Sequence, residues 1–313
     1  MSQSEARHDV AVIGSVNSDL VLRCASLPLL GESIAARGTE IHNGGKGANQ
    51  AVALARLGLS VSMIGRVGSD ADGQRLRSAL DHEGVDTHGL FASEAPTGLA
   101  VILVDDAGDN MIIVNQGANA SLSLADLDAH RVPIEAADTV LIQMEIPLDV
   151  VASAVQMAKG TTVLNPAPAL VLGRDILDHV DYLIPNRTEL GTLAQVEVPA
   201  TEPEVIAAAA SLPFDGTLVV TLGAHGAVAI ADGKVVFRAT PPKVSVVDTV
   251  GAGDAFCAGF AAGITSGRPL VDAVRFAVAC GSHATTIRGA QPSMPALHDA
   301  ERLFPSVGID TVL

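Results

Sequence analysis

Cysteine is scarce in this sequence, which has three such residues among 313. Cys24, Cys257 and Cys280 lie far apart, and no two of them form a CxxC pair. This spacing argues against a zinc site and against the disulfide framework that is typical of small secreted domains. We therefore expect a cytoplasmic protein.

Basic residues and long apolar runs are also few. The 19 Lys and Arg stand against 35 Asp and Glu, a formal net charge of −16, so an extended positive surface for nucleic acid or anionic lipid is not expected. The most apolar stretches are interrupted well short of the about 18 residues of a membrane span, and the N-terminal MSQSEARHD has no apolar segment. The sequence thus predicts no export and no membrane span, and any anionic ligand must be held by local groups.

Hydrophobic residues make up 48% of the chain, which is enough for a large core. The length permits one large domain, or one domain with a small appendage. We expect a compact globular protein.

The stretch from Ser245 to Ser266 reads SVVDTVGAGDAFCAGFAAGITS and combines three elements. Its β-branched residues predict a strand, Gly-Ala-Gly predicts a turn, and the small residues that follow predict a helix beginning at Asp254 or Ala255. The first turn of a helix has unpaired N–H groups and the positive end of the helix dipole, which suits a phosphate. An acidic residue there also stabilises a helix by itself, so this stretch alone leaves a purely structural interpretation equally open.

The position of Asp254 favours one kind of chemistry. A carboxylate beside a bound phosphate repels it, so the arrangement makes sense where the carboxylate faces a hydroxyl group that attacks that phosphate. We therefore expect a phosphoryl transferase with Asp254 as the general base.

The first apolar run, Val10 to Ile13, predicts a buried parallel strand that ends at Gly14. In the segment GSVNSD that follows, Asn17 and Asp19 point to one face if the chain is extended, which suits hydrogen bonding to a polyol. A surface strand with outward polar residues is an equally open interpretation.

Two separate segments predict the four strands of a small sheet. Residues 16–43 contain expected strands over 16–23 and 33–43, and residues 97–117 contain expected strands over 97–105 and 111–117. Such a sheet, formed by two excursions from a larger domain, is suited to act as a lid. The larger domain would comprise residues 1–15, 44–96 and 118–313.

The segment NGGKGANQAVALARLG, residues 43–58, places a glycine-rich turn before a helix expected over Ala48–Leu57. It is not a Walker A loop, because glycine follows Lys46, and no GxGxxG pattern follows the first strand. The glycines let a sugar pack against bare backbone, with Lys46 and Asn49 supplying hydrogen bonds.

GGKGANQA together with DTVGAGDAF closely resembles the ribokinase (PfkB-type) family of carbohydrate kinases. The other motifs follow in the family's order along nearly the whole chain: GSVNSD, QMEIP (143–147), NPAPA (165–169), PNRTE (185–189), TLGAHG (221–226) and GAQPS (289–293). Eight ordered motifs do not coincide by chance.

The rest of the chain alternates between strands and helices, which predicts an α/β fold with a doubly wound, mainly parallel sheet flanked by helices. Strands are expected over 61–67, 139–143, 161–164, 182–184 and 217–222, and helices over 72–83, 148–159 and 204–212. Ligands of such sheets bind beyond the carboxyl ends of the strands, where most of the motifs lie, so we expect one shared cleft.

The resemblance implies an ATP-dependent kinase that converts D-ribose to D-ribose 5-phosphate. Asp254 would take the proton of the 5-hydroxyl group, and Gly251, Ala252 and Gly253 would form an anion hole. The residues implied in sugar binding are Asn17, Asp19, Gly44, Gly45, Lys46, Asn49 and Glu145. Those implied in ATP binding are Asn186, Thr221, Gly223, Gly226 and Gly253.

The resemblance also implies two cations. Asn186 and Glu189 match the family's NxxE motif, in which Glu189 contacts Mg²⁺ through water. The same spacing is that of a helix capping box, and the two roles are compatible. A K⁺ site is implied, mostly through backbone carbonyls, at Asp248, Val250, Ala284, Ile287, Gly289 and Ser293.

Several points stay open. Val278 stands where ribokinases often have a polar residue near the adenine, which leaves purine selectivity undecided. A deoxyribokinase or nucleoside kinase of the same family is the alternative enzyme, and a sugar-binding protein without catalysis is disfavoured by the intact Asp254 and glycine turn. We assign no role to His225 or His283, and we expect a loose C-terminal tail.

The small sheet carries apolar residues on both faces, so one face stays uncovered if the sheet is a lid that opens. We therefore expect a homodimer in which Asp19 reaches the sugar and the opposite face of the sheet meets the partner. The resemblance implies the same pairing.

Overall fold

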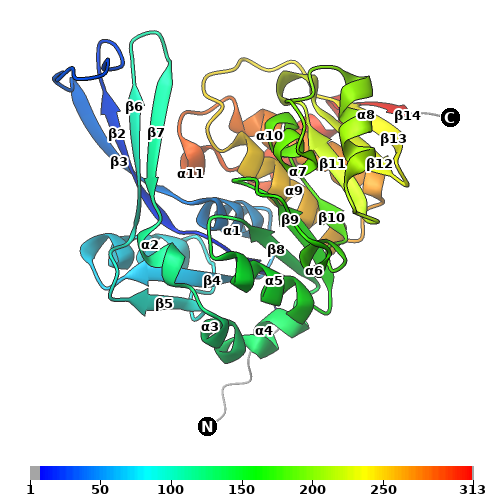
Figure 1. Cartoon of the computed structure of the whole chain (residues 1–313), viewed down its shortest axis with the longest axis horizontal. Helices are drawn as coiled ribbons and strands as arrows, with labels where there is room; N and C mark the ends of the chain where they lie inside the picture. The colour runs from blue at the N-terminus through cyan, green and yellow to red at the C-terminus, as the bar shows by residue number, and fades with distance from the viewer. Residues whose placement is uncertain (1–7, 312–313) are drawn as a thin grey trace.

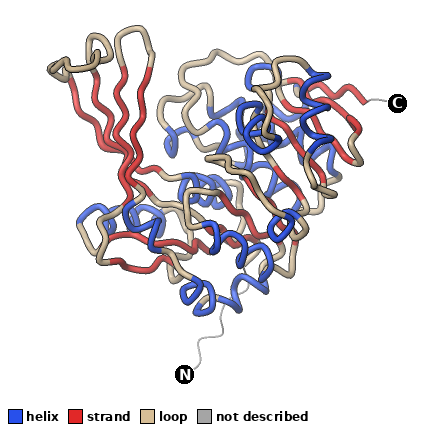
Figure 2. The backbone as a smooth tube through the Cα atoms, in the orientation of Figure 1, coloured by secondary structure: helices blue, strands red, loops and turns tan. Residues whose placement is uncertain are grey.

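The computed structural model describes residues 8–311, and a ten-stranded sheet forms the body of the molecule (Figures 1 and 2). The strand order is β14-β13-β12-β11-β10-β9-β8-β1-β4-β5. The strands from β11 to β5 run parallel, and β12, β13 and β14 continue the sheet antiparallel. The bounds are β1 (Val10–Ile13), β4 (Val61–Gly68), β5 (Leu90–Ser93), β8 (Thr139–Gln143), β9 (Thr161–Asn165), β10 (Tyr182–Leu183), β11 (Thr217–Thr221), β12 (Ala227–Ala231), β13 (Lys234–Thr240) and β14 (Gly308–Thr311).

Helices cover both faces of this sheet, because its central strands are apolar on both sides. In β1, Val10 and Val12 pack into one core cluster, while Ala11 and Ile13 pack into the other. The first face is covered by α1 (Lys46–Arg56), α2 (Ala71–His82), α9 (Ala252–Thr265), α10 (Leu270–Ala284) and α12 (Leu297–Leu303). The second is covered by α3 (Leu124–Ala129), α4 (Arg131–Ala136), α5 (Leu148–Met157), α6 (Arg174–Leu177), α7 (Arg187–Ala194) and α8 (Glu202–Ser211). The predicted doubly wound, mainly parallel fold is confirmed.

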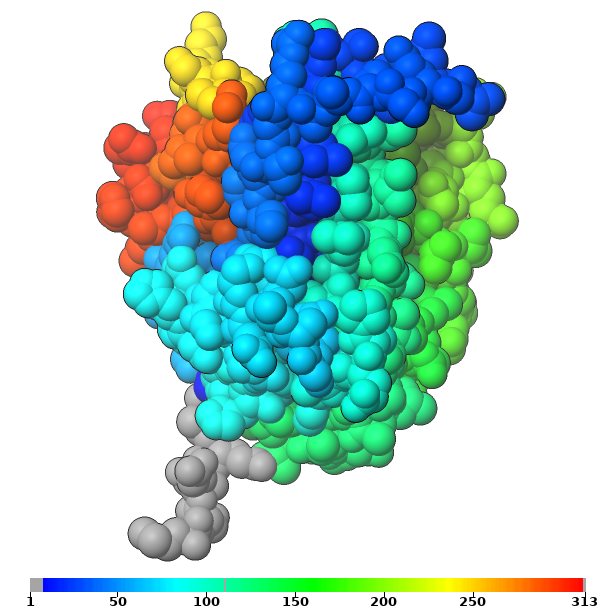
Figure 3. Space-filling model, turned by 90° about the vertical axis from the view of Figure 1, so that its left-hand side faces the viewer, coloured from blue at the N-terminus to red at the C-terminus, as the bar shows by residue number. Residues whose placement is uncertain are grey.

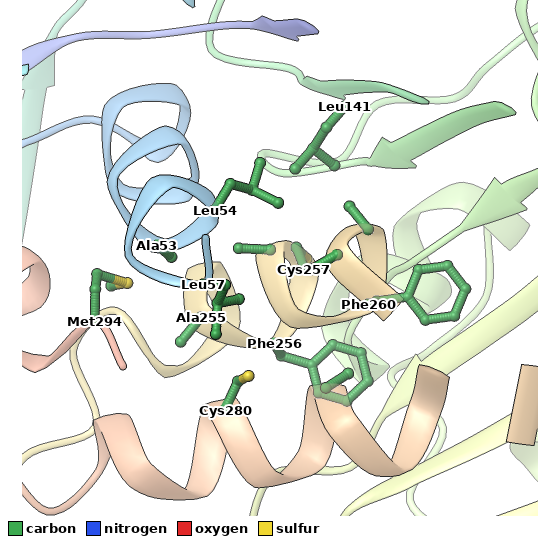
Figure 4. Packing of buried hydrophobic residues seen from close by; sticks show 14 of the residues in the cluster. Ala53, Leu54, Leu57, Leu141, Ala255, Phe256, Cys257, Phe260, Cys280 and Met294 are labelled. Carbon is green, nitrogen blue, oxygen red and sulfur yellow. The ribbon is translucent and has the colours of Figure 1, made fainter. Parts of the chain in front are cut away.

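Small residues let α9 lie close to α10 (Figure 4). A Cβ added at Gly259 would lie 2.7 Å from Sγ of Cys280, and one added at Gly263 would lie 2.8 Å from Cα of Ala273. Side chains at either position would therefore push the two helices apart. The small-residue sequence of α9 thus fixes its position, and with it the position of Asp254 at its first turn.

A second, four-stranded sheet of order β3-β2-β6-β7 projects from the body (Figures 1 and 2). Its strands are β2 (Asn17–Arg23), β3 (Gly38–Gly44), β6 (Gly98–Val104) and β7 (Asn110–Asn115), so the chain leaves the body twice to build it. The expected small sheet is confirmed, although β3 begins at Gly38 and not at residue 33.

Three expectations about local structure are wrong. Residues 244–247 form no strand, because Pro241 and Pro242 interrupt the chain after β13 and no neighbouring strand pairs with this segment. Helix α9 begins at Ala252, two or three residues before the expected start at Asp254 or Ala255, and α1 begins at Lys46, two residues before the expected Ala48. The tail is not loose as far as residue 311, because β14 pairs with β13; residues 312–313 lie outside the described part.

No helix within residues 8–311 is long and apolar enough to cross a membrane. The N-terminal residues 1–7, for which we predicted no apolar targeting segment, lie outside the described residues. Cys24, Cys257 and Cys280 are buried and free, in agreement with the expected absence of a disulfide framework.

Candidate active site

The predicted motifs meet at a cavity of about 160 Å³. It lies where β9, β10 and β11 end and where α1, α7 and α9 begin. The sequence predicted one shared cleft, and residues from five of the motifs line this one cavity. The lining residues are Lys46, Asn165, Ala167, Ile184, Asn186, Glu189, Thr221, Gly251, Gly253, Asp254 and Cys257.

Gly251 allows α9 to begin at the edge of this cavity. It is the N-cap residue and has φ +78°, a left-handed conformation that a residue with Cβ adopts only with strain. An added Cβ would also lie 2.8 Å from Cε of Met294. The predicted anion hole at Gly251, Ala252 and Gly253 thus lies at the start of a 14-residue helix, where unpaired N–H groups suit a phosphate, although the N–H of Ala252 itself donates to the carbonyl of Thr249 over 3.2 Å.

Asp254 is 8% exposed, and both oxygens of its carboxylate accept hydrogen bonds from α1. Asn49 donates from Nδ2 to Oδ2 over 2.9 Å, and Gln50 donates from Nε2 to Oδ1 over 3.0 Å. The amide nitrogen of Asn49 therefore faces Asp254, while its expected contact with the sugar stays a prediction. Gln50 was not expected from the sequence, because nothing in an apolar helix pattern shows which side chains reach another helix.

Lys46 lies among three carboxylates, those of Asp254, Glu145 and Glu189. Burial lowers the pKa of the Lys46 ammonium group, but the carboxylates of Asp254, Glu145 and Glu189 raise it more, and the net shift is upward. Lys46 therefore stays charged and partly balances these carboxylates. Glu145 is held by Ser15, whose Oγ donates to Oε2 over 2.5 Å.

Asp19 lies on the small sheet next to the same cluster, against the bare backbone of Gly44. Burial and the negative charges of Glu145 and Asp254 raise the pKa of Asp19 to about 7. The carboxyl group therefore changes its charge near neutral pH, and in its ionised form it only accepts hydrogen bonds.

Asn17 stands two residues before Asp19 in β2, so the two side chains share one face as expected. Its Oδ1 accepts a hydrogen bond of 2.7 Å from Nδ2 of the buried Asn119. Asn119 follows the small sheet at the point where the chain returns to the body, and its position was not predicted.

The expected capping box at α7 is present. Asn186 accepts from the backbone N–H of Glu189 over 2.8 Å, and Glu189 accepts from the backbone N–H of Asn186 over 2.7 Å. Burial raises the pKa of Glu189, and the nearby Asp254 adds to this shift against the opposing effects of Asn186 and Lys46. The capping interpretation is therefore confirmed, and the carboxylate also lines the cavity, so a cation could meet it there.

A larger cavity of about 700 Å³ adjoins the first, and Gly253 and Thr221 line both. Nothing lies within 4 Å of the position that a Cβ of Gly253 would take. The cavity also contains Gly223, Gly226 and Val278, and many of its walls are apolar: Pro241, Pro242, Val244, Val246, Ala252 and Phe256. A cavity of this kind could hold a nucleotide, with its planar base between the apolar walls and its phosphates next to Gly253.

The segments predicted to hold K⁺ also lie together. Asp248 accepts from the backbone N–H of Val250 over 3.1 Å and from that of Gly289 over 2.9 Å, and so joins the two loops. Ser293 is fully buried and donates to the carbonyl of Ala290, while Ile287 is 38% exposed. No group of three or more His, Cys, Asp or Glu that could hold a metal occurs within the part of the chain that the structure describes.

The two histidines to which we assigned no role lie outside the cavity around Asp254. His283 is buried, and its Nε2 lies 3.8 Å from Oδ2 of Asp299. Burial lowers the pKa of His283. His225 ends the short helical turn Gly223–His225.

Comparison with known proteins identifies the family. The model of the pfkB family carbohydrate kinases matches residues 7–297. Ribokinase of Schizosaccharomyces pombe is 38% identical over 310 residues, with 95% of this chain and 98% of the relative covered, and ribokinase of Haemophilus influenzae is 38% identical over 296 residues, with 92% and 96% covered. A structure of Arabidopsis thaliana ribokinase complexed with ribose and ATP has a TM-score of 0.86 at 32% identity, with 96% of this chain and 99% of that chain covered. The match across the whole sheet and its motifs means that this chain belongs to the pfkB family of carbohydrate kinases.

Proposed function

We propose that this kinase transfers the γ-phosphoryl group of ATP to the 5-hydroxyl group of D-ribose. The observation that carries the proposal is the position of Asp254, which lies in the first turn of α9 and lines the smaller cavity next to Gly253, a residue that lines both cavities. The larger cavity suits the nucleotide, and the smaller one contains Lys46, whose charge is influenced by Asp254, Glu145 and Glu189. The ribokinases of known sequence and the ribose-bound and ATP-bound structure support this choice of substrates.

The reaction follows from this arrangement. The sugar lies against Gly44 and Gly45, where Asn17, Asp19, Lys46, Asn49 and Glu145 are available for its hydroxyl groups. Its 5-hydroxyl oxygen attacks the γ-phosphorus, the bond from that phosphorus to the bridging oxygen of ADP breaks, and the hydroxyl proton passes to the carboxylate of Asp254. Because the transition state is loose, alignment of the hydroxyl contributes more than the basicity of Asp254.

The first turn of α9 supplies electrostatic stabilisation. Gly253 lines both cavities, so its N–H group would stabilise the charge that develops on the transferred phosphoryl group, whereas the N–H of Ala252 donates to the carbonyl of Thr249 over 3.2 Å. Asn186, Thr221, Gly223 and Gly226 lie along the path from this point to the apolar end of the larger cavity and would hold the nucleotide. Val278 lines that cavity and offers no hydrogen-bonding group, so selectivity for a purine would have to come from other lining residues, such as Thr249, Ser282 or Thr285.

Both expected cations fit the residues present. Mg²⁺ needs only one or two carboxylates beside phosphate and water, and Glu189 is such a carboxylate within the smaller cavity. Bound there, the ion would neutralise charge on the phosphates. K⁺ would lie between the loops joined by Asp248, held mostly by backbone carbonyls; the residues concerned are Val250, Ala284, Ile287, Gly289 and Ser293. Kinase activity should then rise when potassium replaces a large organic cation at equal ionic strength, and a flat response would remove this site.

We infer further that residues 16–43 and 97–117 move as a lid on the larger domain. A cavity of about 530 Å³ separates the Asp19 face of the small sheet from the loops at Val247 and Gly289, which leaves room for closure. The lid would also form a homodimer, as argued below. A cytoplasmic location is compatible with the three buried free cysteines.

The test is Asp254→Asn, assayed by release of ADP with a panel of pentoses and nucleosides. Turnover of D-ribose should fall by orders of magnitude while ribose binding persists, because the shape survives and proton acceptance does not. Near-normal turnover would remove Asp254 from the mechanism. A preference for deoxyribose or a nucleoside would favour the alternative kinases, and binding without turnover in the unmodified protein would favour a sugar-binding protein.

A further inference from the structure

A chain of three buried side chains ends on the proposed catalytic base. Gln143, at the end of β8, donates from Nε2 to Oε1 of Gln50 over 2.5 Å, and Gln50 donates from Nε2 to Oδ1 of Asp254 over 3.0 Å. Both glutamines are 0% exposed. Neither belongs to the residues that the family resemblance implied in binding or catalysis.

The direction of this chain is fixed at its catalytic end. An ionised carboxylate only accepts hydrogen bonds, so the nitrogen of Gln50 must face Asp254 and its oxygen must face Gln143. Gln143 must then present its nitrogen. Every amide in the chain therefore has one orientation while Asp254 is charged.

A second contact fixes the same orientation independently. Asn165 donates from Nδ2 to the carbonyl of Ile184 over 3.0 Å, which leaves its Oδ1 toward Gln50. Gln50 donates to this oxygen from the same Nε2 over 3.4 Å. Its NH₂ group thus serves two acceptors, Asp254 and Asn165, and cannot turn without losing both.

Within the described part of the chain, the Gln143 side chain uses its nitrogen but not its oxygen. Its Oε1 has no hydrogen-bond partner among residues 8–311 and is buried, which costs about 1–3 kcal/mol in general. The same oxygen lies where a Cβ of Gly14 would be, so the end of β1 has to be glycine to leave room. The amide nitrogen is the polar part of Gln143 that has a partner, and this partner is Gln50.

We propose that Gln50 is a positioning residue that holds the carboxylate of Asp254 in its reactive orientation, and that Gln143 orients Gln50. This inference rests on the proposed role of Asp254 as the base. Asn49 holds the second oxygen, so the carboxylate plane is fixed from two consecutive residues of α1. The 5-hydroxyl group then meets a base that does not rotate, which matters where alignment limits the reaction.

Three substitutions test the proposal. Gln50→Met removes the donor at nearly constant volume and should lower kcat about 10- to 100-fold, with KM for D-ribose and ATP within about twofold. Gln143→Met leaves the oxygen of Gln50 without a hydrogen bond and should lower kcat less than Gln50→Met does. At pH values where the new carboxyl group is ionised, Gln143→Glu should lower kcat more than Gln143→Met, because a carboxylate only accepts, turns the Gln50 amide and directs its oxygen at Asp254; at lower pH the protonated carboxyl group donates to Gln50 and the difference should disappear.

Gln156→Met is the matched control, since Gln156 is exposed on α5, away from the cavities. Thermal unfolding and calorimetric D-ribose binding of each variant separate lost positioning from lost folding. Unchanged kcat in Gln50→Met, or a ratio of kcat between Gln143→Glu and Gln143→Met that does not fall as pH rises, would overturn the proposal. An inactive wild-type protein would instead overturn the proposed function, whereas an active wild type with an inactive Asp254→Asn variant leaves only the role of Gln50 in question.

Discussion

Asn119 and Asn17 are 102 positions apart, yet Nδ2 of Asn119 donates to Oδ1 of Asn17 over 2.7 Å. Asn119 also pairs with the backbone of Val16, accepting from its N–H over 2.9 Å and donating to its carbonyl over 3.3 Å. One side chain therefore joins the two places where the chain enters and leaves the small sheet. Because the oxygen of Asn17 is engaged, its NH₂ group is the part left to donate to a sugar.

Asn119→Asp should therefore impair sugar binding more than catalysis. An aspartate still accepts from Val16, but it repels Oδ1 of Asn17, so the Asn17 amide turns and offers the wrong group. We expect KM for D-ribose to rise about tenfold and KM for ATP to stay constant, with a loss of roughly 1–3 kcal/mol in the free energy of unfolding. Reduced stability with an unchanged KM would mean that Asn119 only anchors the sheet.

Substitution of two glycines of the same motif by alanine should have different effects, one on ATP binding and the other on stability. Gly253→Ala should fold normally, because a Cβ there meets nothing within 4 Å and alanine favours a helix, but it should raise KM for ATP where the phosphates would lie. Gly251→Ala should lower the free energy of unfolding by roughly 1–2 kcal/mol or more, because of φ +78° and the contact with Met294. Denaturant unfolding and steady-state kinetics of the pair would check this, and similar effects of both variants would contradict it.

The sequence predicted most of what depends on local pattern and little of what depends on distant partners. The strands β1 and β8 and the capping box of α7 agree because apolar runs and capping residues act within a few positions. The expected strand at 244–247 failed because pairing needs a neighbour, and β14 was missed because its neighbour β13 is far along the chain. Gln50 could not be recognised, since its partner Asp254 is 204 positions away.

Sugar binding should depend on pH through Asp19, whose pKa is raised to about 7. The carboxylate form accepts hydrogen bonds from sugar hydroxyls, so KM for D-ribose should fall roughly tenfold between pH 6 and pH 8 as the ionised fraction rises. Steady-state kinetics across this range would show it. Asp19→Asn should remove this dependence, and a KM that varies equally with pH in that variant would assign the effect to another group.

Stability should change in the opposite direction. The folded pKa of Asp19 lies above its usual value of 3.8, so the native state favours the protonated group. The contribution of Asp19 to folding therefore decreases as pH rises from about 4 to 7. We expect Asp19→Asn to raise the thermal midpoint more at pH 8 than at pH 5, and an equal shift at both values would contradict the raised pKa.

The small sheet carries an apolar row on the face opposite Asp19. Ile41, Leu20, Val101 and Ile113 are neighbours across its four strands, and Ile41 and Ile113 are 60% and 64% exposed. In the space-filling view the blue and teal strands of this sheet form a continuous strip at the front (Figure 3). Ile113→Asp should shift a homodimer toward the 31.9 kDa monomer, because an interface would bury the new charge without a partner.

Ile112→Asp is the matched control for this interface. Ile112 is the preceding residue of β7, is 55% exposed, and points to the other face, where it lines the cavity with Asp19. The same charge at this position should leave the dimer intact at micromolar concentration in sedimentation or light scattering. If both variants dissociate, the substitutions have disturbed the fold of the small sheet and not only its contact with a partner. If the wild-type protein is itself a monomer under these conditions, the sheet does not form a dimer interface, and the proposal of kinase activity is not affected. A dimer that persists in Ile113→Asp would place the contact elsewhere, because two like charges facing each other across a two-fold axis repel in addition to losing their water.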